Sequence, residues 1–136
     1  MTMTSDRPWH PSITGDDRKA RGSLAYLSGL AGENAVCAQY EARGYRLCET
    51  RWRGRAGEID LIFEKSDMFI FVEVKTSQSL ARAADSLSAR QLGRICTSAQ
   101  DYIAQTPQGT LADMRIDVAL VDAKGAIEII ENASIL

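Results

Sequence analysis

Residues 57–75 decide the fold of this chain, and they read GEIDLIFEKSDMFIFVEVK. The segments 57–64 and 68–75 are rich in β-branched and aromatic residues, and the polar stretch 65–67 separates them. This pattern predicts two strands joined by a tight turn. A turn centred between residues 66 and 67 sets an antiparallel register, whose pairs are Glu64 with Phe69, Ile62 with Phe71 and Asp60 with Glu73.

Three polar side chains of this hairpin are expected on one face of the sheet: Asp60, Glu73 and Lys75. Opposed residues of antiparallel strands share a face, with Cβ atoms about 4.5–5.5 Å apart. Lys75 points the same way as Glu73 because it lies two residues further along the strand. Two carboxylates held this close repel each other unless a cation or a shared proton lies between them. The arrangement therefore indicates a functional site.

Asp60 and Glu73 are suitable ligands for Mg²⁺ or Mn²⁺, which take oxygen ligands and need only one or two protein carboxylates. The main-chain carbonyl of Val74 could add a third oxygen ligand. The ammonium of Lys75 could orient or deprotonate a water molecule on the ion, and offset negative charge in the transition state. These four residues together predict attack on a phosphodiester bond.

Glu33 adds a third carboxylate, at the margin of the apolar sector of the first predicted helix. It either shares the metal or the water with Asp60 and Glu73, or it hydrogen-bonds a tyrosine or a main-chain amide. Taken alone, the pattern favours the second role. We leave Glu58 outside the metal site, although it could pair with an arginine of the neighbouring loop.

Composition predicts one soluble domain. The chain has 136 residues, of which 45% are hydrophobic and 25% charged, and this suffices for a single core over residues 21–136. The longest apolar run, residues 68–72, is far shorter than the roughly 20 residues of a membrane span. The N-terminal residues lack the apolar segment of a secretory signal. We therefore expect a cytoplasmic location and no membrane partner.

The cysteine and histidine content excludes several classes of metal site and active site. Cys37, Cys48 and Cys96 are odd in number and widely spaced, which argues against a disulfide framework and a CxxC zinc site. We interpret them as small buried apolar residues. His10 is the only histidine, and it lies in the predicted tail between Pro8 and Pro11, so a histidine zinc site, a Ser-His-Asp triad and a Cys-His pair are excluded.

An arginine cluster lies just before the hairpin. Residues 43–55 contain five arginines and one acid, with Tyr45 and Trp52 between them, although the formal net charge of the chain is -2. Guanidinium groups match phosphate oxygens and a ring can stack on a base. We therefore assign nucleic-acid binding to Arg51, Arg53 and Arg55. An exposed strand and loop whose arginines face water is an equally good interpretation.

The remaining segments complete an α/β pattern. Residues 1–20 are polar without periodicity, which predicts a flexible tail. Apolar spacing predicts helices over 22–43, ended by Gly44, and over 81–105. Strands are predicted over 45–52, 114–121 and 126–130, with a turn at 122–125. The order α-β-β-β-α-β-β predicts an α/β sandwich with a central mixed five-stranded sheet flanked by helices.

Five motifs carry a resemblance to a known family over about residues 22–122. They are Gly32-Glu33, Gly44-Tyr45, Gly57-Glu58-Ile59-Asp60-Leu61-Ile62, Phe71-Val72-Glu73-Val74-Lys75-Thr76 and Arg115-x-Asp117-Val118. This set resembles the YraN-like family, also known as UPF0102. That family is assigned to the PD-(D/E)XK nuclease superfamily, near the archaeal Holliday junction resolvases. The resemblance implies a restriction-endonuclease-like sandwich.

The same resemblance implies roles for single residues. Asp60, Glu73 and Lys75 occupy the acid, acid, x, lysine positions of the superfamily, and Glu33 occupies its first-helix acid. The second helix carries Gln91 where many relatives have a lysine. Several superfamily nucleases use a glutamine near this position to orient the water, so Gln91 joins the candidate catalytic residues.

The leading hypothesis is a Mg²⁺- or Mn²⁺-dependent endonuclease that hydrolyses DNA, including branched or processed structures. The sequence leaves open whether RNA is a substrate and whether the protein forms a homodimer. A second hypothesis is a nucleic-acid-binding protein that keeps a nuclease fold without cutting, whose binding would weaken steeply with salt. In a third, Lys75 bridges Asp60 and Glu73 as a structural ion pair, and replacing Lys75 should then destabilise the fold.

Overall fold

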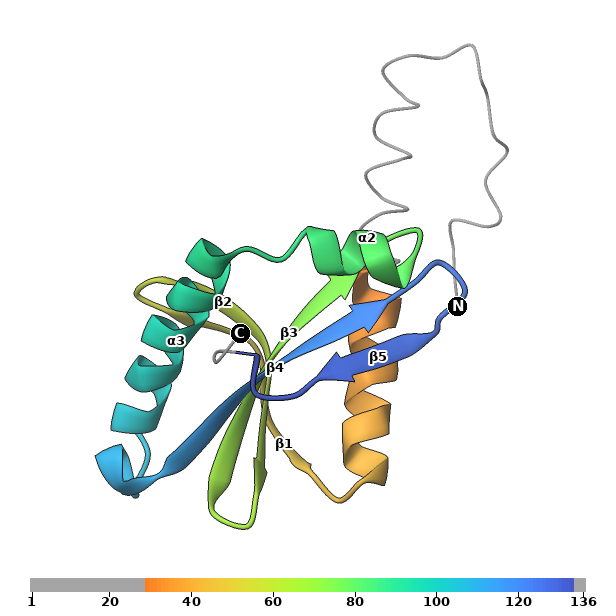
Figure 1. Ribbon diagram of the computed structural model, residues 1–136. Coiled ribbons are helices and arrows are strands. Elements are labelled where there is room, and N and C mark those ends of the chain that lie inside the picture. Colours follow the sequence, from red (N-terminus) through yellow and green to blue (C-terminus); the bar gives the residue numbers. More distant parts are fainter. Residues whose placement is uncertain (1–28, 134–136) are drawn as a thin grey trace, which may run out of the picture.

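The computed structural model describes residues 29–133 and is drawn as a ribbon in Figure 1. The predicted tail of residues 1–20 and the start of the helix predicted over 22–43 lie outside the described residues. Within residues 29–133, no helix is long and apolar enough to span a membrane. The elements are helix 29–42, β1 (Arg46–Gly54), β2 (Gly57–Lys65), β3 (Met68–Thr76), α2 (Leu80–Asp85), α3 (Ala89–Ala104), the 3-10 helix η2 (Gly109–Leu111), β4 (Asp113–Val121) and β5 (Ile127–Ile130).

The strands form one five-stranded sheet in the order β1-β2-β3-β4-β5. Neighbouring strands are antiparallel, except that β3 and β4 run parallel. The helices α2 and α3 lie in the connection between these two, because parallel neighbours need a long crossover. The predicted mixed sheet flanked by helices is therefore confirmed, and each strand lies within two residues of its predicted bounds.

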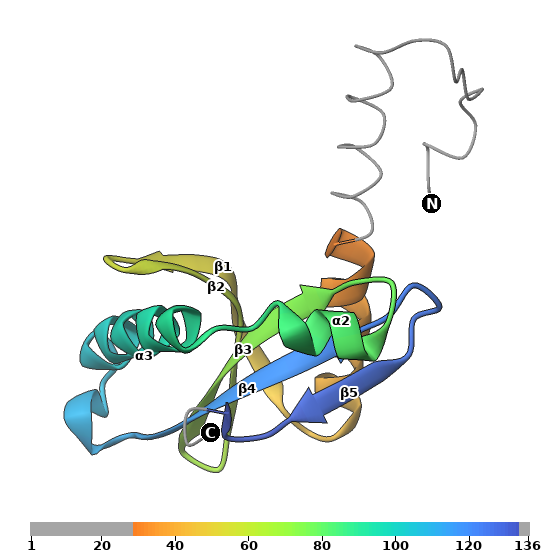
Figure 2. The ribbon, with the colours of Figure 1, turned by 45° about the horizontal axis from the view of Figure 1, so that its top comes forward.

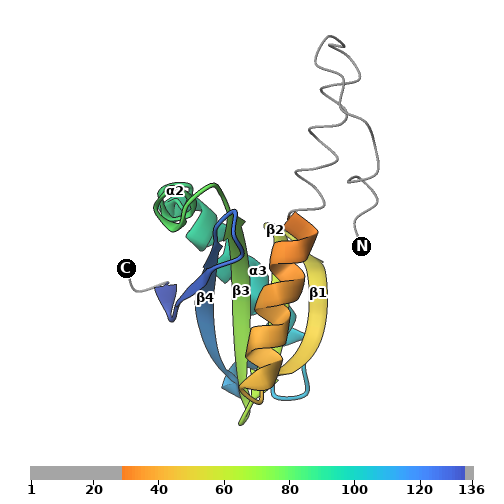
Figure 3. The ribbon, with the colours of Figure 1, turned by 90° about the vertical axis from the view of Figure 1, so that its right-hand side faces the viewer.

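Helix 29–42 and α3 cover opposite faces of the sheet, as Figure 3 shows. On one face, Val36 and Tyr40 of helix 29–42 pack on β2, β3 and β4. On the other face, Ile95 and Ala99 of α3 pack on the same central strands. The three cysteines are free and pack against these two clusters, but they are half-buried and not fully buried as predicted.

The end of helix 29–42 agrees with its prediction. The Tyr45 N–H donates to the Tyr40 carbonyl at 3.1 Å, and the Gly44 N–H donates to the Glu41 carbonyl at 3.0 Å. This pair of hydrogen bonds is the Schellman motif, which satisfies carbonyls left without partners at a helix end. The chain leaves the helix here and enters β1.

The hairpin of β2 and β3 has the predicted register. Its pairs include Glu64 with Phe69 and Ile62 with Phe71. Ser66 and Asp67 both have positive φ, of 52° and 63°, which matches the tight turn that hairpins prefer. Regular pairing ends at Leu61 and Val72, one step before the predicted pair of Asp60 and Glu73. The two strands therefore separate where the predicted site begins.

The single helix predicted over 81–105 is wrong, because the structure divides it into α2 and α3. Ser79 and Ser88 each cap a separate helix, with the Oγ atoms accepting from the Arg82 and Gln91 N–H groups at 3.1 Å. Between the helices, the Ser86 hydroxyl donates to the Ala83 carbonyl at 2.6 Å. Serine competes in this way with main-chain helix bonds, which helical periodicity alone does not reveal.

Candidate active site

The predicted site residues meet where β2 and β3 separate. Asp60 comes from β2, Glu73 and Lys75 come from β3, and Gln91 comes from the first turn of α3. The Ser88 cap fixes the start of α3, and this places Gln91 beside the end of β3. Residues from three separate elements are thus brought together in one place.

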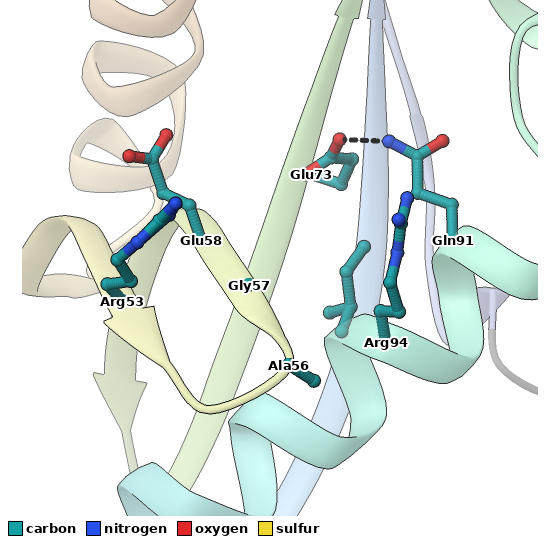
Figure 4. A pocket seen from close by; sticks show the side chains of 8 residues that line it. Arg53, Ala56, Gly57, Glu58, Glu73, Gln91 and Arg94 are labelled. Carbon is teal, nitrogen blue, oxygen red and sulfur yellow. Dashed lines mark hydrogen bonds between the residues drawn. The ribbon is translucent and has the colours of Figure 1, made fainter.

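Glu73 is the centre of this site. It is a buried carboxylate, with 9% of its surface exposed. Its Oε2 atom accepts a hydrogen bond of 2.8 Å from the Gln91 amide nitrogen, and it lies 3.5 Å from the Lys75 ammonium nitrogen. Figure 4 shows the Gln91 amide directed at Glu73 from α3. Glu73 therefore has one amide and one cationic partner.

The Glu73 carboxyl group is unusually basic. Burial is the largest cause, the nearby Asp60 carboxylate is the second, and together they raise the pKa of Glu73 to about 7 against an opposing effect of Lys75. The protonated form of Glu73 can also share a hydrogen bond with Asp60. Repulsion between these two acids follows directly from the geometry predicted for the hairpin, in which they converge from neighbouring strands.

Asp60 is held by the main chain of β3. Its Oδ2 atom accepts a hydrogen bond of 2.8 Å from the Val74 N–H, so a side chain replaces the next main-chain partner in the ladder. This bond keeps the Asp60 carboxylate at the point of strand separation. Val74, which was predicted to be a site residue, therefore contacts Asp60 through its N–H group.

Glu33 joins the site from helix 29–42, but its partner is an arginine. The Arg51 guanidinium donates to Glu33 Oε1 at 2.8 Å. The predicted hydrogen-bond partner was a tyrosine or a main-chain amide, and the alternative was a role at the metal or water beside Asp60 and Glu73. Burial and then Asp60 raise the pKa of Glu33, and Arg51 lowers it. Asp60 is therefore close enough to Glu33 to influence its charge. Helix 29–42 can approach β3 here because residue 32 is glycine, where a Cβ atom would lie 2.9 Å from Thr76 Oγ1.

Arg51 has an unusual backbone. Its φ angle is +50°, in the left-handed region that residues other than glycine seldom occupy. It lies between the pairs Thr50–Leu61 and Trp52–Ile59, which places it opposite Asp60. Strained backbone conformations of this kind are frequent at functional sites, where the surrounding structure holds the residue in place.

The arginine cluster is divided between ion pairs and free groups. Arg46 pairs with Glu64, Arg51 with Glu33 and Arg55 with Asp101. Arg53 has no carboxylate partner among the described residues. The two interleaved rings are half-buried and pack on other rings, Tyr45 against Tyr40 and Trp52 against Tyr102.

A pocket of about 370 Å³ opens beside Glu73, between the β1–β2 hairpin and α3. Figure 4 shows Arg53 and Glu58 on the hairpin side, and Gln91 and Arg94 on the α3 side. Two of these residues, Arg94 and Glu58, were not predicted to belong to the site. Arg94 follows Gln91 by three residues and so shares its helix face, a spacing visible in the sequence. Glu58 was left outside the metal site, and it lines this pocket with Arg53, its partner in the sheet register.

Few protein side chains at this site could act as ligands of a metal ion. In the part of the chain that the structure describes, no three His, Cys, Asp or Glu side chains form a group suited to one metal ion. Asp60 and Glu73 are the two carboxylates that converge, and Val74 lies between Glu73 and Lys75. Magnesium commonly uses one or two protein carboxylates and completes its shell with water and substrate phosphates.

The fold and these side chains define a mixed α/β protein with two acids, a lysine and a glutamine at the separating ends of two central strands. The family model described as "Uncharacterised protein family UPF0102" matches residues 32–121, and the chain belongs to this family. It is 54% identical to a UPF0102 protein of Ruegeria pomeroyi over 84% of this chain and 93% of that relative. It is 52% identical to one of Roseobacter denitrificans, over 82% and 87% of the two chains. All four residues of the site lie inside the matched region.

Proposed function

We propose that this protein is a metal-dependent endonuclease that hydrolyses phosphodiester bonds of DNA, with the restriction-endonuclease-like fold of the PD-(D/E)XK superfamily. The observation that carries the proposal is the buried Glu73 carboxylate, which lies among Asp60, Lys75 and Gln91. A sheet gains no stability from two converging acids. Such pairs are typical of sites where a positive charge is bound. We expect the protein to act in the cytoplasm, where nucleic-acid substrates lie.

The donor set fits Mg²⁺ or Mn²⁺. Asp60 and Glu73 offer carboxylate oxygens from two strands, and the Val74 carbonyl is the expected third oxygen. The raised pKa of Glu73 indicates negative charge that its protein partners do not fully compensate. When bound, the ion would supply positive charge at the phosphodiester and lower the pKa of a nearby water.

The protein residues have distinct roles in this proposal. Lys75 orients the attacking water and offsets negative charge as it develops. Gln91 holds Glu73 in one orientation through its 2.8 Å hydrogen bond. Glu33 lies close enough to Asp60 to feel its charge, and its pairing with Arg51 fixes both of the paired side chains.

The direct test is cleavage of single-stranded, duplex and four-way DNA with Mg²⁺ or Mn²⁺. Wild-type protein is compared with Asp60→Ala and Glu73→Ala, and with Asp85→Ala at the exposed end of α2 as the matched control. Products from wild type and from the control, but not from the two site variants, support the proposal. Equal cleavage by all four proteins points to a contaminating nuclease, and no product from any protein contradicts hydrolysis.

A non-catalytic nucleic-acid-binding protein is the second candidate function. One observation favours it: Glu33, Asp60 and Glu73 each already have a protein partner, in Arg51, Val74 and Lys75 with Gln91 respectively. Salt-sensitive DNA binding with neither products nor calorimetric metal binding would support this second function.

A further inference from the structure

The pocket between the β1–β2 hairpin and α3 contains two arginines on opposite walls. Arg53 lies on β1, and Arg94 lies on α3 one helical turn beyond Gln91. We propose that these two side chains together bind a phosphate group of the nucleic-acid strand, next to the phosphate that is cleaved. This inference rests on the proposed function, and it assigns the path of the strand past the site.

Charge pairing and position together select these two arginines. Among the described residues, Arg46, Arg51, Arg55 and Arg115 each lie within ion-pair distance of a carboxylate, whereas Arg53 and Arg94 do not. Other arginines in the described part of the chain also lack such a partner, namely Arg43, Arg82 and Arg90, but they do not line the pocket. Both side chains are exposed, so they are available to a ligand. A guanidinium can form two parallel hydrogen bonds with phosphate oxygens, which makes arginine well suited to this contact.

Two carboxylates also line the pocket and define where a phosphate fits. Glu73 is at its inner end, where Gln91 and Lys75 contact it. Glu58 lies on the hairpin wall beside Arg53. A phosphate is repelled by both acids, so its favourable position is between the two guanidinium groups. Removing the charge of Glu58 should therefore strengthen binding.

The walls of the pocket are held at a fixed separation. The Ser98 hydroxyl of α3 donates to the Gly57 carbonyl at 2.9 Å, and Ser98 is 1% exposed. A Cβ atom at residue 54 would lie 2.7 Å from Ser98 Oγ, so glycine is needed for this close approach. Arg55 of the hairpin turn also pairs with Asp101 of α3 at 3.0 Å. Figure 2 shows the hairpin extending alongside α3.

The spacing on α3 places this phosphate close to the site. Gln91 and Arg94 differ by three residues, which is about 4.5 Å along a helix axis. Since Gln91 contacts Glu73, the Arg94 guanidinium is positioned beside the phosphodiester that Glu73 would face. The Arg53–Arg94 pair therefore binds a backbone phosphate next to the cleaved one. Such a contact does not distinguish one base from another.

The test is fluorescence anisotropy with a fluorescein-labelled DNA oligonucleotide, at a series of salt concentrations. The double variant Arg53→Gln/Arg94→Gln is compared with Arg43→Gln/Arg82→Gln, which removes the same charge from two exposed arginines outside the pocket. The pocket variant should bind about tenfold more weakly and lower the salt slope by about one, as expected when one phosphate contact is lost. Glu58→Gln should bind more tightly than wild type.

A single methylphosphonate placed along the oligonucleotide locates the contact. At the phosphate next to the cleaved one, this neutral group should weaken wild-type binding and leave the pocket variant unaffected, because the two changes remove the same interaction. If the pocket variant binds like its control, or if the methylphosphonate weakens both proteins equally, the phosphate site is wrong. If the affinities and salt slopes of the variants follow the prediction but wild type cleaves nothing, hydrolysis is wrong and the phosphate site stands, because these two measurements need no cleaved position.

Discussion

The Gln91 amide nitrogen donates a hydrogen bond of 2.8 Å to Glu73 Oε2, and this bond joins the first turn of α3 to the end of β3. Gln91 is a neutral donor, so it stabilises the orientation of the Glu73 carboxylate without supplying a full positive charge. The Lys75 ammonium, at 3.5 Å, is the nearest cationic group in an ion pair with Glu73. Glu73 therefore keeps a high affinity for a further cation or a proton.

The first prediction concerns the pH dependence of the metal-free protein. The pKa of Glu73 is raised from 4.5 to about 7 by burial and by Asp60. Between these values the unfolded carboxyl has lost its proton while the folded one retains it, so stability falls as pH rises and levels off above about pH 7. Glu73→Gln resembles the protonated form and should become more stable than wild type across this range. Urea unfolding with a chelator present measures the difference.

Glu128→Gln provides the control for this experiment, because residue 128 is an exposed glutamate on β5. Its stability relative to wild type should not change over the same pH range. A difference between Glu73→Gln and wild type that is flat, or that grows toward acid pH, would contradict the environment described for Glu73.

The second prediction separates a catalytic from a structural Lys75. Lys75→Met should reduce cleavage by at least about 100-fold, the usual scale of a lost acid–base group. The free energy of unfolding at pH 6 should change by less than about 1 kcal/mol, because Glu73 can take up a proton when its cationic partner is gone. Lys124→Met, in the exposed β4–β5 turn, is the control. A loss of several kcal/mol would instead support the structural ion pair.

The third prediction tests the strained backbone at Arg51. A residue with a side chain costs roughly 1–2 kcal/mol in the left-handed region, and glycine avoids this cost. Arg51→Gly and Arg51→Ala both remove the ion pair with Glu33, so their difference isolates the backbone. The glycine variant should be more stable by about 1 kcal/mol. At Arg53, which lies in the same strand, the order should reverse, because glycine weakens an ordinary strand position. Thermal unfolding of the four variants measures the difference between glycine and alanine at each of the two positions.

A buried network on the opposite face of the sheet supports the fold. Asp117 is fully buried and accepts hydrogen bonds from the Tyr40 hydroxyl at 2.6 Å, from Arg115 at 2.8 and 2.9 Å, and from the Asn132 N–H at 3.0 Å. It connects helix 29–42, β4 and the segment that follows β5. The motif Arg115-x-Asp117 therefore has a structural role here.

The fourth prediction follows from this network. Asp117→Asn leaves the Arg115 guanidinium without its charged partner in a largely buried place, so unfolding should require about 3–5 kcal/mol less free energy. Asp113→Asn, at an exposed position of the same strand, should stay within about 0.5 kcal/mol of wild type. Chemical denaturation measures both. Similar stabilities of the two variants would show that the network does not hold these elements together.

Much of the fold could be predicted because its strands have strong local signals. The alternating pattern and the short turn of residues 57–75 determine the register up to Leu61 and Val72. The same register brought Asp60 and Glu73 to one place. The break between α2 and α3 was missed because serine caps, and not a change in apolar periodicity, separate the two helices.

Other parts of the site depend on contacts between distant elements. The pairing of Glu33 with Arg51 joins helix 29–42 to β1, and nothing in the local sequence around either residue specifies it. The pocket that Arg94 lines exists because Ser98 and Gly54 allow the hairpin and α3 to approach closely. Glu58 lines the same pocket beside Arg53, its register partner in β1, although it was not predicted to belong to the site.

The central claim is that Asp60 and Glu73 together hold one divalent ion. A crystal soaked in Mn²⁺ and measured for anomalous scattering tests it most directly, with a crystal of Asp60→Asn as the control. We predict one peak in the wild-type crystal, about 2.0–2.2 Å from an oxygen of each carboxylate, and none at this place in the control. A wild-type crystal with no peak between the two carboxylates would contradict the account.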